Sequence, residues 1–259
     1  MRILIVNDDG LHSNGMLHLE EELSKFYEVY SICPDRQRSA TSQAITIRET
    51  LIVEKVSETH FKVNGYPTDC VNIGLYGNLI PPVDIVISGI NHGPNLGDDI
   101  HYSGTVGAAR HAVIHNKKAI AISYENFDFN GNFRRVARWL RIWLEENYQY
   151  LNPDVIYNIN YPYEEEEDSL EKPFPEVVYT FQGSRIYKDS YEILEEEHQE
   201  RWVMKLKETI LAKEVLPGSD FEAIQNKKIS ITPLSLTTTH WEELNRWKNL
   251  QKQPQAKSL

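Results

Sequence analysis

The sequence predicts an α/β protein with three layers, in which helices cover both faces of a mostly parallel central sheet. Short apolar runs alternate with helical patterns through about the first 162 residues. The apolar runs are nearly continuous, as in strands buried on both faces, and the clearest helix has one apolar face. Repeated alternation of this kind is typical of parallel strands that are connected by crossover helices.

The individual elements follow from these patterns. Strands are expected at residues 2–7, 27–34, 83–91, 118–124 and 154–162, and helices at residues 15–26, 67–79, 105–115 and 133–147. Pro67 suits the first turn of its helix. The helix at 133–147 repeats apolar residues at i, i+3, i+4, i+7 and i+8. Two runs rich in β-branched residues, 44–56 and 60–65, predict an antiparallel ribbon.

The pattern weakens after about Pro162. The acidic run EEEED at 164–168 is expected to be a solvated loop, and a strand returns only at 227–234, before a short helix near 240–250. We therefore describe one domain, 1–259, with a catalytic core at 1–162 and a C-terminal arm, returning strand and terminal helix at 163–259. Tyr187, Tyr191 and Trp202 fall in the weak region and would form an exposed apolar patch. This predicts at least a dimer.

Composition excludes several classes of protein. The 38 acidic residues outnumber the 27 basic ones, giving a net charge of −11, which argues against binding of a nucleic acid polymer. Only two cysteines occur, Cys33 and Cys70, without CxxC spacing, so a reducing compartment is expected. No apolar run approaches the roughly 18 residues of a membrane span. A cytoplasmic protein that does not bind membranes is the expectation.

Asp8 and Asp9 stand side by side directly after the first apolar run. An Asp-Gly pair can be a simple turn, and a strand-end Asp can cap the next helix. Two adjacent carboxylates also suit a hard divalent cation such as Mg²⁺ or Mn²⁺. The motifs NDDG, PDRQRSA and SGINHGPNLGDD each follow a predicted strand. Because ligands bind at the carboxyl ends of parallel strands, we expect all three motifs at one edge of the sheet.

The glycine-rich segment SGINHGPNLGDDIHYSGTVGAA predicts a phosphate site. Ser103, Gly104 and Thr105 open a helix, whose free N–H groups can bind an anion. Asn91 and Asn95 offer oxygens or amides beside it. A long loop with a Ser or Thr helix cap explains the same residues, so a phosphate-binding Thr105 and a capping Thr105 both stay open.

Other motifs point less clearly to chemistry. The chain has no GxGxxG after its first strand, no P-loop and no GxSxG. His111 and His115 have the i, i+4 spacing of zinc ligands, but HAVIH lacks the glutamate of HExxH. His12 is a candidate proton donor, although an ordinary surface histidine explains it as well.

These motifs together resemble the SurE (survival protein E) family of metal-dependent nucleotidases. The resemblance is carried by ILIVNDDG, PDRQRSA, GYPTDCV, SGINHGPNLGDDIHYSGTVGAA and SITPL, and it spans residues 3 to about 234. It implies a Rossmann-like core with an extended C-terminal arm or β-hairpin. It also implies hydrolysis of nucleoside 5′- and 3′-monophosphates, with short polyphosphate tolerated, by homodimers or homotetramers.

The resemblance also assigns residues to roles. It implies one divalent metal ion per subunit, Mg²⁺ or Mn²⁺, held by Asp8, Asp9, Ser39 and Asn91. On this reading Asp8 and Asp9 are the catalytic residues. The residues expected to bind the substrate phosphate are Asn95, Ser103, Gly104 and Thr105.

Two alternative functions remain open at this point. An aspartyl-phosphate phosphatase would use Asp8 or Asp9 as a nucleophile, although the usual DxD spacing is absent. A non-catalytic nucleotide-sensing or phospho-receiver-like module would also place an acidic pair after its first strand. Such a module would end its third strand in an Asp, whereas this chain has Gly89-Ile90-Asn91 there.

Overall fold

The computed structural model describes residues 1–127, 131–164, 172–197, 201–207 and 210–252. Its centre is a nine-stranded sheet with the order β3-β4-β2-β1-β5-β6-β7-β13-β8. The strands are β1 (Arg2–Val6), β2 (Glu28–Pro34), β3 (Val53–Lys55), β4 (His60–Val63), β5 (Ile85–His92), β6 (Lys118–Tyr124), β7 (Val155–Tyr161), β8 (Val177–Tyr179) and β13 (Ile229–Ser235). Neighbours pair in parallel except β3 with β4 and β13 with β7, so the predicted mostly parallel sheet is confirmed.

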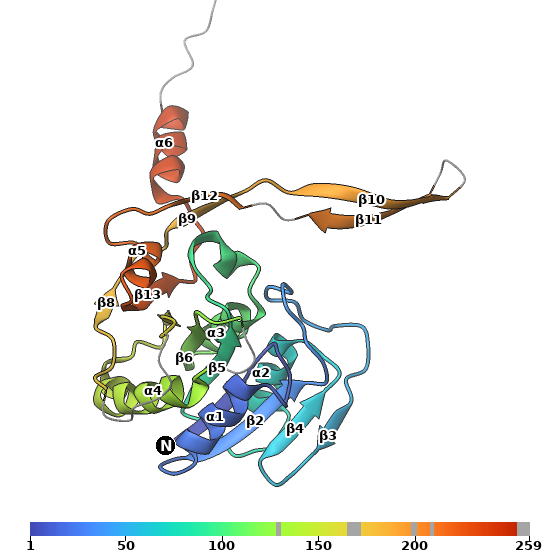
Figure 1. Ribbon diagram of the computed structural model, residues 1–259, viewed down its shortest axis with the longest axis vertical. Helices are drawn as coiled ribbons and strands as arrows, with labels where there is room; N and C mark the ends of the chain where they lie inside the picture. The colour runs from blue at the N-terminus through green and yellow to red at the C-terminus, as the bar shows by residue number, and fades with distance from the viewer. Residues whose placement is uncertain (128–130, 165–171, 198–200, 208–209, 253–259) are drawn as a thin grey trace, which may run out of the picture.

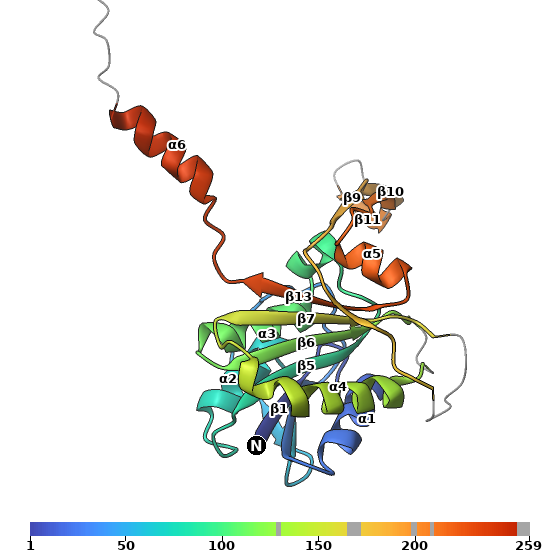
Figure 2. The ribbon, with the colours of Figure 1, turned by 90° about the vertical axis from the view of Figure 1, so that its left-hand side faces the viewer.

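Two pairs of helices cover the two faces of the sheet. Helices α1 (Asn14–Leu23) and α4 (Phe133–Asn147) lie side by side on one face (Figure 2), and α2 (Pro67–Tyr76) and α3 (Gly104–Ile114) contact each other on the opposite face. The alternation of strand β1 divides the core accordingly: Ile3 and Ile5 pack with α1 and α4, while Leu4 and Val6 pack with α2 and α3. The three-layer prediction is therefore confirmed.

The ribbon expected from the β-branched run at 44–56 is much shorter than predicted. Only β3 forms a strand there, antiparallel to β4, while residues 44–52 contain no strand. Ile47 and Ile52 are 82% and 60% exposed. Strand propensity depends on a partner strand and a buried face, and this segment has neither.

The C-terminal part, whose sequence pattern was weak, contains further strands. These are β9 (Ser184–Tyr187), β10 (Ser190–Glu197), β11 (Arg201–Lys207) and β12 (Ile210–Glu214). Strands β10 and β11 form an antiparallel hairpin that projects from the body, and β12 pairs with β9 at its base (Figure 1). We call residues 184–214 the arm, of which 198–200 and 208–209 lie outside the described residues.

Two short helices complete this region. Helix α5 (Asp220–Gln225) lies near the base of the arm, and α6 (Trp241–Lys252) stands away from the sheet (Figure 2). Of the acidic run at 164–168, only Glu164 is described. It is not a freely solvated side chain, since it pairs with Arg135 at 2.7 Å between Oε2 and Nε. In the described part of the chain, no helix has the length and apolar character needed to cross a membrane.

Candidate active site

The loops that follow β1, β2 and β5 meet at the carboxyl edge of the sheet, as the three motifs predict. Strand β1 lies between β2 and β5. Its loop is joined to both neighbours: the Arg38 N–H donates to the Asp8 carbonyl oxygen at 2.7 Å, and the His92 N–H donates to Asp9 Oδ2 at 3.3 Å. Segments far apart in the chain therefore place their polar side chains around the acidic pair.

The turn after β1 is built by Asn7, Gly10 and Ser13. Gly10 has φ +93°, which favours glycine, and its N–H donates to Asn7 Oδ1 at 3.2 Å. Asn7 Nδ2 donates to the Gly10 carbonyl oxygen and to Ser13 Oγ, both at 2.8 Å. The side chain of Ser13 caps α1. Asn7 therefore forms the turn and Ser13 caps α1. The two carboxylates of Asp8 and Asp9 are needed for neither of these roles.

Asp8 is 4% exposed and is held by the start of α3. The Thr105 hydroxyl donates to Asp8 Oδ1 at 2.6 Å. Burial, and next the charge of Asp9, raise the pKa of Asp8 to about 7, although the bonds from Thr105 oppose the rise. Asp8 therefore carries an unfavourable charge at neutral pH unless a cation is bound beside it.

Asp9 is the more open member of the acidic pair. Burial raises its pKa, while hydrogen bonds from the His92 backbone and the Gln37 side chain act in the opposite direction. Gln37 Nε2 also donates to Ser39 Oγ at 3.1 Å. Gln37 was not selected from the sequence, although it lies inside the PDRQRSA motif.

A cavity of about 420 Å³ opens at this edge of the sheet. Five of the residues expected at the site line it: Asp8, Ser39, Asn91, Asn95 and Ser103. Asn91 Nδ2 donates to the carbonyl oxygens of His92 and Gly93 at 3.2 and 2.8 Å, and neither bond uses its Oδ1. The structure thus brings Asp8, Ser39 and Asn91 to one cavity, with Asp9 adjacent in the chain to Asp8.

The start of α3 explains why Ser103, Gly104 and Thr105 occur together. Ser103 Oγ caps the helix by accepting the Val106 N–H at 3.0 Å, so the capping residue is Ser103. A Cβ on Gly104 would lie 3.0 Å from Asp8 Cβ and Oδ2, which makes a larger residue unfavourable there. Thr105 is fully buried against Asp8. Its hydroxyl therefore orients Asp8, a role that the sequence did not suggest.

Asn95 is fixed by a buried polar cluster on β6 and β7. Its carbonyl oxygen accepts from Asn158 Nδ2 at 2.9 Å and from Asn160 Nδ2 at 3.1 Å, and its Nδ2 donates to Ser123 Oγ at 2.7 Å. Asn158 and Asn160 were missed in the sequence. Their signal was two amides at alternate positions in an otherwise apolar strand, which indicates buried polar groups that need partners.

The arm supplies part of the cavity wall. Arg185 and Tyr187 of β9 line the cavity together with Asp99. Arg185 Nη1 lies 2.7 Å from Asp99 Oδ2, and the Tyr187 hydroxyl donates to Asp99 Oδ1. The Tyr187 hydroxyl is thus bonded within its own chain, and its position near a subunit interface stays a prediction. Tyr191 and Trp202 are 63% and 51% exposed on the projecting hairpin.

The histidine candidates lie elsewhere. The His111 and His115 rings contact each other, with 3.2 Å between their Nε2 atoms, and bond Asn72 and Tyr76 respectively. No group of three or more His, Cys, Asp and Glu side chains suited to a metal occurs among the described residues. The hydrogen bond between the two rings explains why His111 and His115 lie four residues apart on one helix. His12 is exposed and does not line the cavity.

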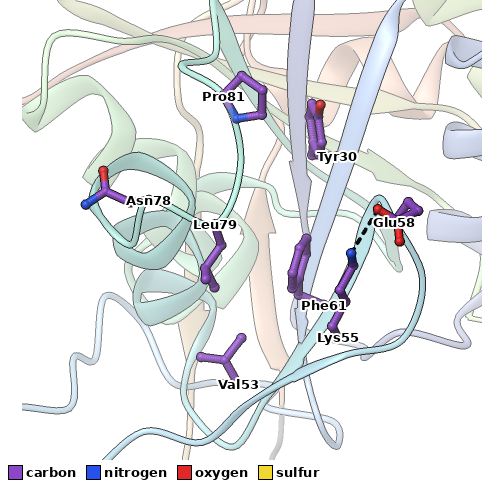
Figure 3. A pocket seen from close by; sticks show the side chains of 8 residues that line it. All are labelled: Tyr30, Val53, Lys55, Glu58, Phe61, Asn78, Leu79 and Pro81. Carbon is purple, nitrogen blue, oxygen red and sulfur yellow. Dashed lines mark ion pairs between the residues drawn. The ribbon is translucent and has the colours of Figure 1, made fainter.

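A second cavity, of about 510 Å³, lies among β2, β3, β4 and the segment 78–81 (Figure 3). Lys55 and Glu58 form an ion pair there at 2.9 Å between Nζ and Oε2. None of the site residues predicted from the sequence lines it. We therefore place the chemistry at the carboxyl edge of the sheet.

The donors around Asp8 fit a hard divalent cation. Two carboxylates, an amide oxygen and a hydroxyl are the oxygen ligands that Mg²⁺ and Mn²⁺ prefer. Within the described ranges, neither Asp8 nor Asp9 forms an ion pair with a Lys, Arg or His side chain. Among the described residues, the negative charge of the pair thus has no ion-paired side chain, and a bound cation would supply a counterion.

Fold and site together define an α/β protein that pairs oxygen donors for a cation with a helix N-terminus suited to an anion. This pairing is typical of enzymes that act on phosphate esters. Residues 3–189 match the family model described as survival protein SurE. The chain therefore belongs to the SurE family.

Individual relatives agree with this assignment. A protein named 5′-nucleotidase SurE from Leptospira interrogans serovar copenhageni is 41% identical over 251 residues, covering 95% of this chain and 96% of the relative. Its namesake from Leptospira biflexa serovar Patoc is 39% identical over 253 residues, covering 96% and 98%. The crystal structure of the SurE protein from Aquifex aeolicus superposes with a TM-score of 0.81 at 29% identity, covering 97% of this chain and 100% of that one.

Proposed function

We propose that this protein is a phosphatase that hydrolyses nucleoside 5′- and 3′-monophosphates to nucleoside and phosphate. The observation that carries the proposal is the acidic pair beside the start of α3, in which the buried Asp8 lines a cavity of about 420 Å³ and Asp9 is partly buried next to it. Relatives at 39–41% identity over nearly the whole chain are named 5′-nucleotidases, which supports the same class of enzyme. A non-catalytic receiver-like module has no comparable support, because β5 continues into Asn91 and His92 rather than ending in an Asp.

The proposed cation ligands are Asp8, Asp9, Ser39 and Asn91. The cation, Mg²⁺ or Mn²⁺, would neutralise the phosphoryl oxygens and make a water more acidic. Asn91 is suited to this role because its Nδ2 donates to two backbone carbonyl oxygens, which fixes the orientation of its amide group and leaves both of these bonds off its Oδ1. Thr105 holds Asp8 in one position, so the ligand is oriented before substrate arrives.

The phosphate would lie between the acidic pair and the start of α3. Asn95 and Ser103 line the cavity and provide polar atoms, while Gly104 and Thr105 stand in the first turn of α3, where the helix N-terminus favours an anion. Asp8 is the member of the pair that lines the cavity, and we assign it the acceptance of a proton from the attacking water. As the new P–O bond forms to that water, the ester P–O bond breaks, and the nucleoside oxygen leaves with a proton taken up from solvent water.

The experiment that tests this function is phosphate release from AMP with Mn²⁺ or Mg²⁺. We expect EDTA to abolish activity and either cation to restore it. Asp8→Asn and Asp9→Asn should each lower kcat/KM by orders of magnitude without loss of fold, whereas the exposed Asp154→Asn should leave it unchanged. Full activity in EDTA would exclude the metal mechanism.

We further propose that the protein forms a homodimer or homotetramer through the arm. The hairpin exposes Tyr191, Ile193, Leu194, Trp202 and Met204, each by half or more. Helix α6 likewise exposes Trp241 and Trp247, by 60% and 57%. Apolar surface of this extent on segments that project from the body supports contact with a second copy.

We also propose a cytoplasmic location. Cys33 and Cys70 are both buried free thiols. A reducing compartment suits a chain whose two cysteines remain unpaired.

A further inference from the structure

Two exposed aromatic side chains line the candidate active-site cavity and have no part in the proposed phosphate chemistry. Tyr102 is 62% exposed and Phe127 is 76% exposed. The cavity that they line also contains Asp8, Asn91 and Ser103. Large aromatic side chains gain free energy when they are covered, so their exposure beside a polar ligand site indicates that part of a ligand covers them.

Tyr102 is positioned directly next to the proposed phosphate site. It follows the 3₁₀ helix η1 (Gly97–His101), and its N–H donates to the Asp99 carbonyl oxygen at 3.0 Å. Its own carbonyl oxygen accepts from the Ser42 N–H at 2.8 Å. The next residue, Ser103, caps α3. The backbone of Tyr102 is thus held from two segments, while its ring remains open to the cavity.

Phe127 is positioned against the backbone of Gly93. Gly93 has φ +89°, and a Cβ at that position would lie 2.4 Å from Phe127 Cε1. The Gly93 carbonyl oxygen accepts from the Asn91 side chain, which is a proposed cation ligand. Only glycine therefore lets the ring lie this close to the chain that carries Asn91. Tyr102 thus directly precedes Ser103 in the chain, and Phe127 contacts Gly93, which lies two residues after Asn91.

The chemistry of the two rings fits a nucleobase. A nucleoside monophosphate joins a charged phosphate to a planar aromatic base, and bases stack on aromatic side chains with little dependence on their identity. We propose that Tyr102 and Phe127 bind the base of the substrate and are the specificity-determining residues that favour nucleotides over other phosphate esters. This inference rests on the proposed phosphatase function and adds a base-binding part to the same cavity.

Comparison of two substrates isolates the contribution of the base. AMP and ribose 5-phosphate share the phosphate and the ribose, and only AMP carries a base. We expect Tyr102→Ala and Phe127→Ala each to lower kcat/KM for AMP about tenfold or more, and to change kcat/KM for ribose 5-phosphate less than twofold. Tyr102→Phe and Phe127→Tyr keep an aromatic ring and should retain the preference for AMP.

A matched control and a binding measurement complete the test. Tyr150 is 74% exposed and does not line the cavity, so Tyr150→Ala should change neither substrate's kinetics. Binding of adenosine, measured by calorimetry, should weaken at least tenfold in Tyr102→Ala and Phe127→Ala. Equal losses for AMP and ribose 5-phosphate, or unchanged adenosine binding, would overturn the inference.

The same data separate this inference from the proposed function. A wild-type protein that binds adenosine through these rings but releases no phosphate from any ester would refute the phosphatase and leave base binding in place. A wild-type phosphatase with equal kcat/KM for AMP and ribose 5-phosphate would refute base binding and leave the phosphatase in place.

Discussion

Asp8, which is buried, and Asp9, which is partly buried, are each bound and oriented by a neighbouring segment. Thr105 donates to Asp8, and the His92 backbone donates to Asp9. These hydrogen bonds favour the charged forms but do not outweigh burial, which raises the pKa of both carboxyls. At the residue scale, ionising both carboxyls is therefore unfavourable in the protein alone, and a divalent cation would offset that cost.

Thr105→Ala tests whether this hydroxyl serves the acidic pair. The change removes a hydrogen bond to a charged group, which typically contributes about 1.5–3 kcal/mol. We expect the Mn²⁺ concentration for half-maximal activity to rise about tenfold or more, with a smaller change in KM for AMP. Thr105→Ser should behave like the wild type. A raised KM with unchanged Mn²⁺ activation would instead favour a hydroxyl that binds phosphate.

The pH dependence of stability tests the raised pKa of Asp8. The folded protein holds a proton on Asp8 up to about pH 7, whereas an ordinary Asp loses it near pH 3.8. Between these values the folded state binds more protons than the unfolded state, so this group lowers the free energy of unfolding as pH rises. In EDTA, Asp8→Asn should therefore gain stability relative to the wild type as pH rises from about 4 to about 7.

Added Mn²⁺ should reverse this trend, because the cation binds the ionised carboxylates. We expect it to raise the melting temperature of the wild type more at pH 8 than at pH 5, and to have little effect on Asp8→Asn. A melting temperature that does not respond to Mn²⁺ at pH 8 would contradict the cation site.

At the scale of elements, Asp220 joins the arm to the loop that leads into the active site. It begins α5 and is fully buried. Its Oδ2 accepts the Gly97 N–H at 2.8 Å and its Oδ1 accepts the Gly183 N–H at 2.9 Å. Gly97 opens η1, which precedes Tyr102, and Gly183 precedes β9. One carboxylate thus couples two segments that together form part of the cavity wall.

Asp220→Ala should destabilise the protein strongly. It leaves at least two backbone N–H groups in a buried region without their acceptor, and each such group costs about 1–3 kcal/mol. We expect a loss of about 2–5 kcal/mol in urea unfolding, together with a lower kcat/KM for AMP because Arg185 and Tyr187 lose their fixed position. The exposed Asp154→Ala serves as control and should stay within about 0.5 kcal/mol of the wild type. Unchanged stability of Asp220→Ala would mean that other contacts anchor the arm.

At the scale of the whole molecule, the body forms its own core while the arm and α6 extend beyond it (Figures 1 and 2). Among the described residues, the core clusters on the two faces of the sheet contain none from the hairpin. Apolar side chains on β10 and β11 are instead exposed to solvent in the isolated chain. A second copy that covers them would remove this surface from water.

Light scattering after size exclusion tests the assembly. The mass should be at least twice the chain mass of 30.1 kDa at micromolar concentration. Replacing Tyr191 and Trp202 together by Lys should shift the mass toward one chain, while the same change at Tyr76 and Tyr150, which are exposed on the body, should not. A wild-type protein that elutes with the mass of a single chain would refute the proposed oligomer.

The sequence by itself determined the layers and the edge of the sheet at which the site forms. Continuous apolar strands and the amphipathic helix at 133–147 are local patterns, so they can be recognised without knowing which segments meet. The same holds for the loops that carry Asp8, Ser39 and Asn91, because a loop after a parallel strand always reaches the carboxyl edge.

Only the tertiary structure decided how the site is completed. Thr105 contacts Asp8 across 97 residues, Tyr187 contacts Asp99 across 88, and Asp220 contacts Gly97 across 123. Such contacts have no periodicity in the chain, and the arm that provides some of them had only a weak pattern. They form because the packed sheet brings distant loops to one edge, where buried donors and acceptors must find partners.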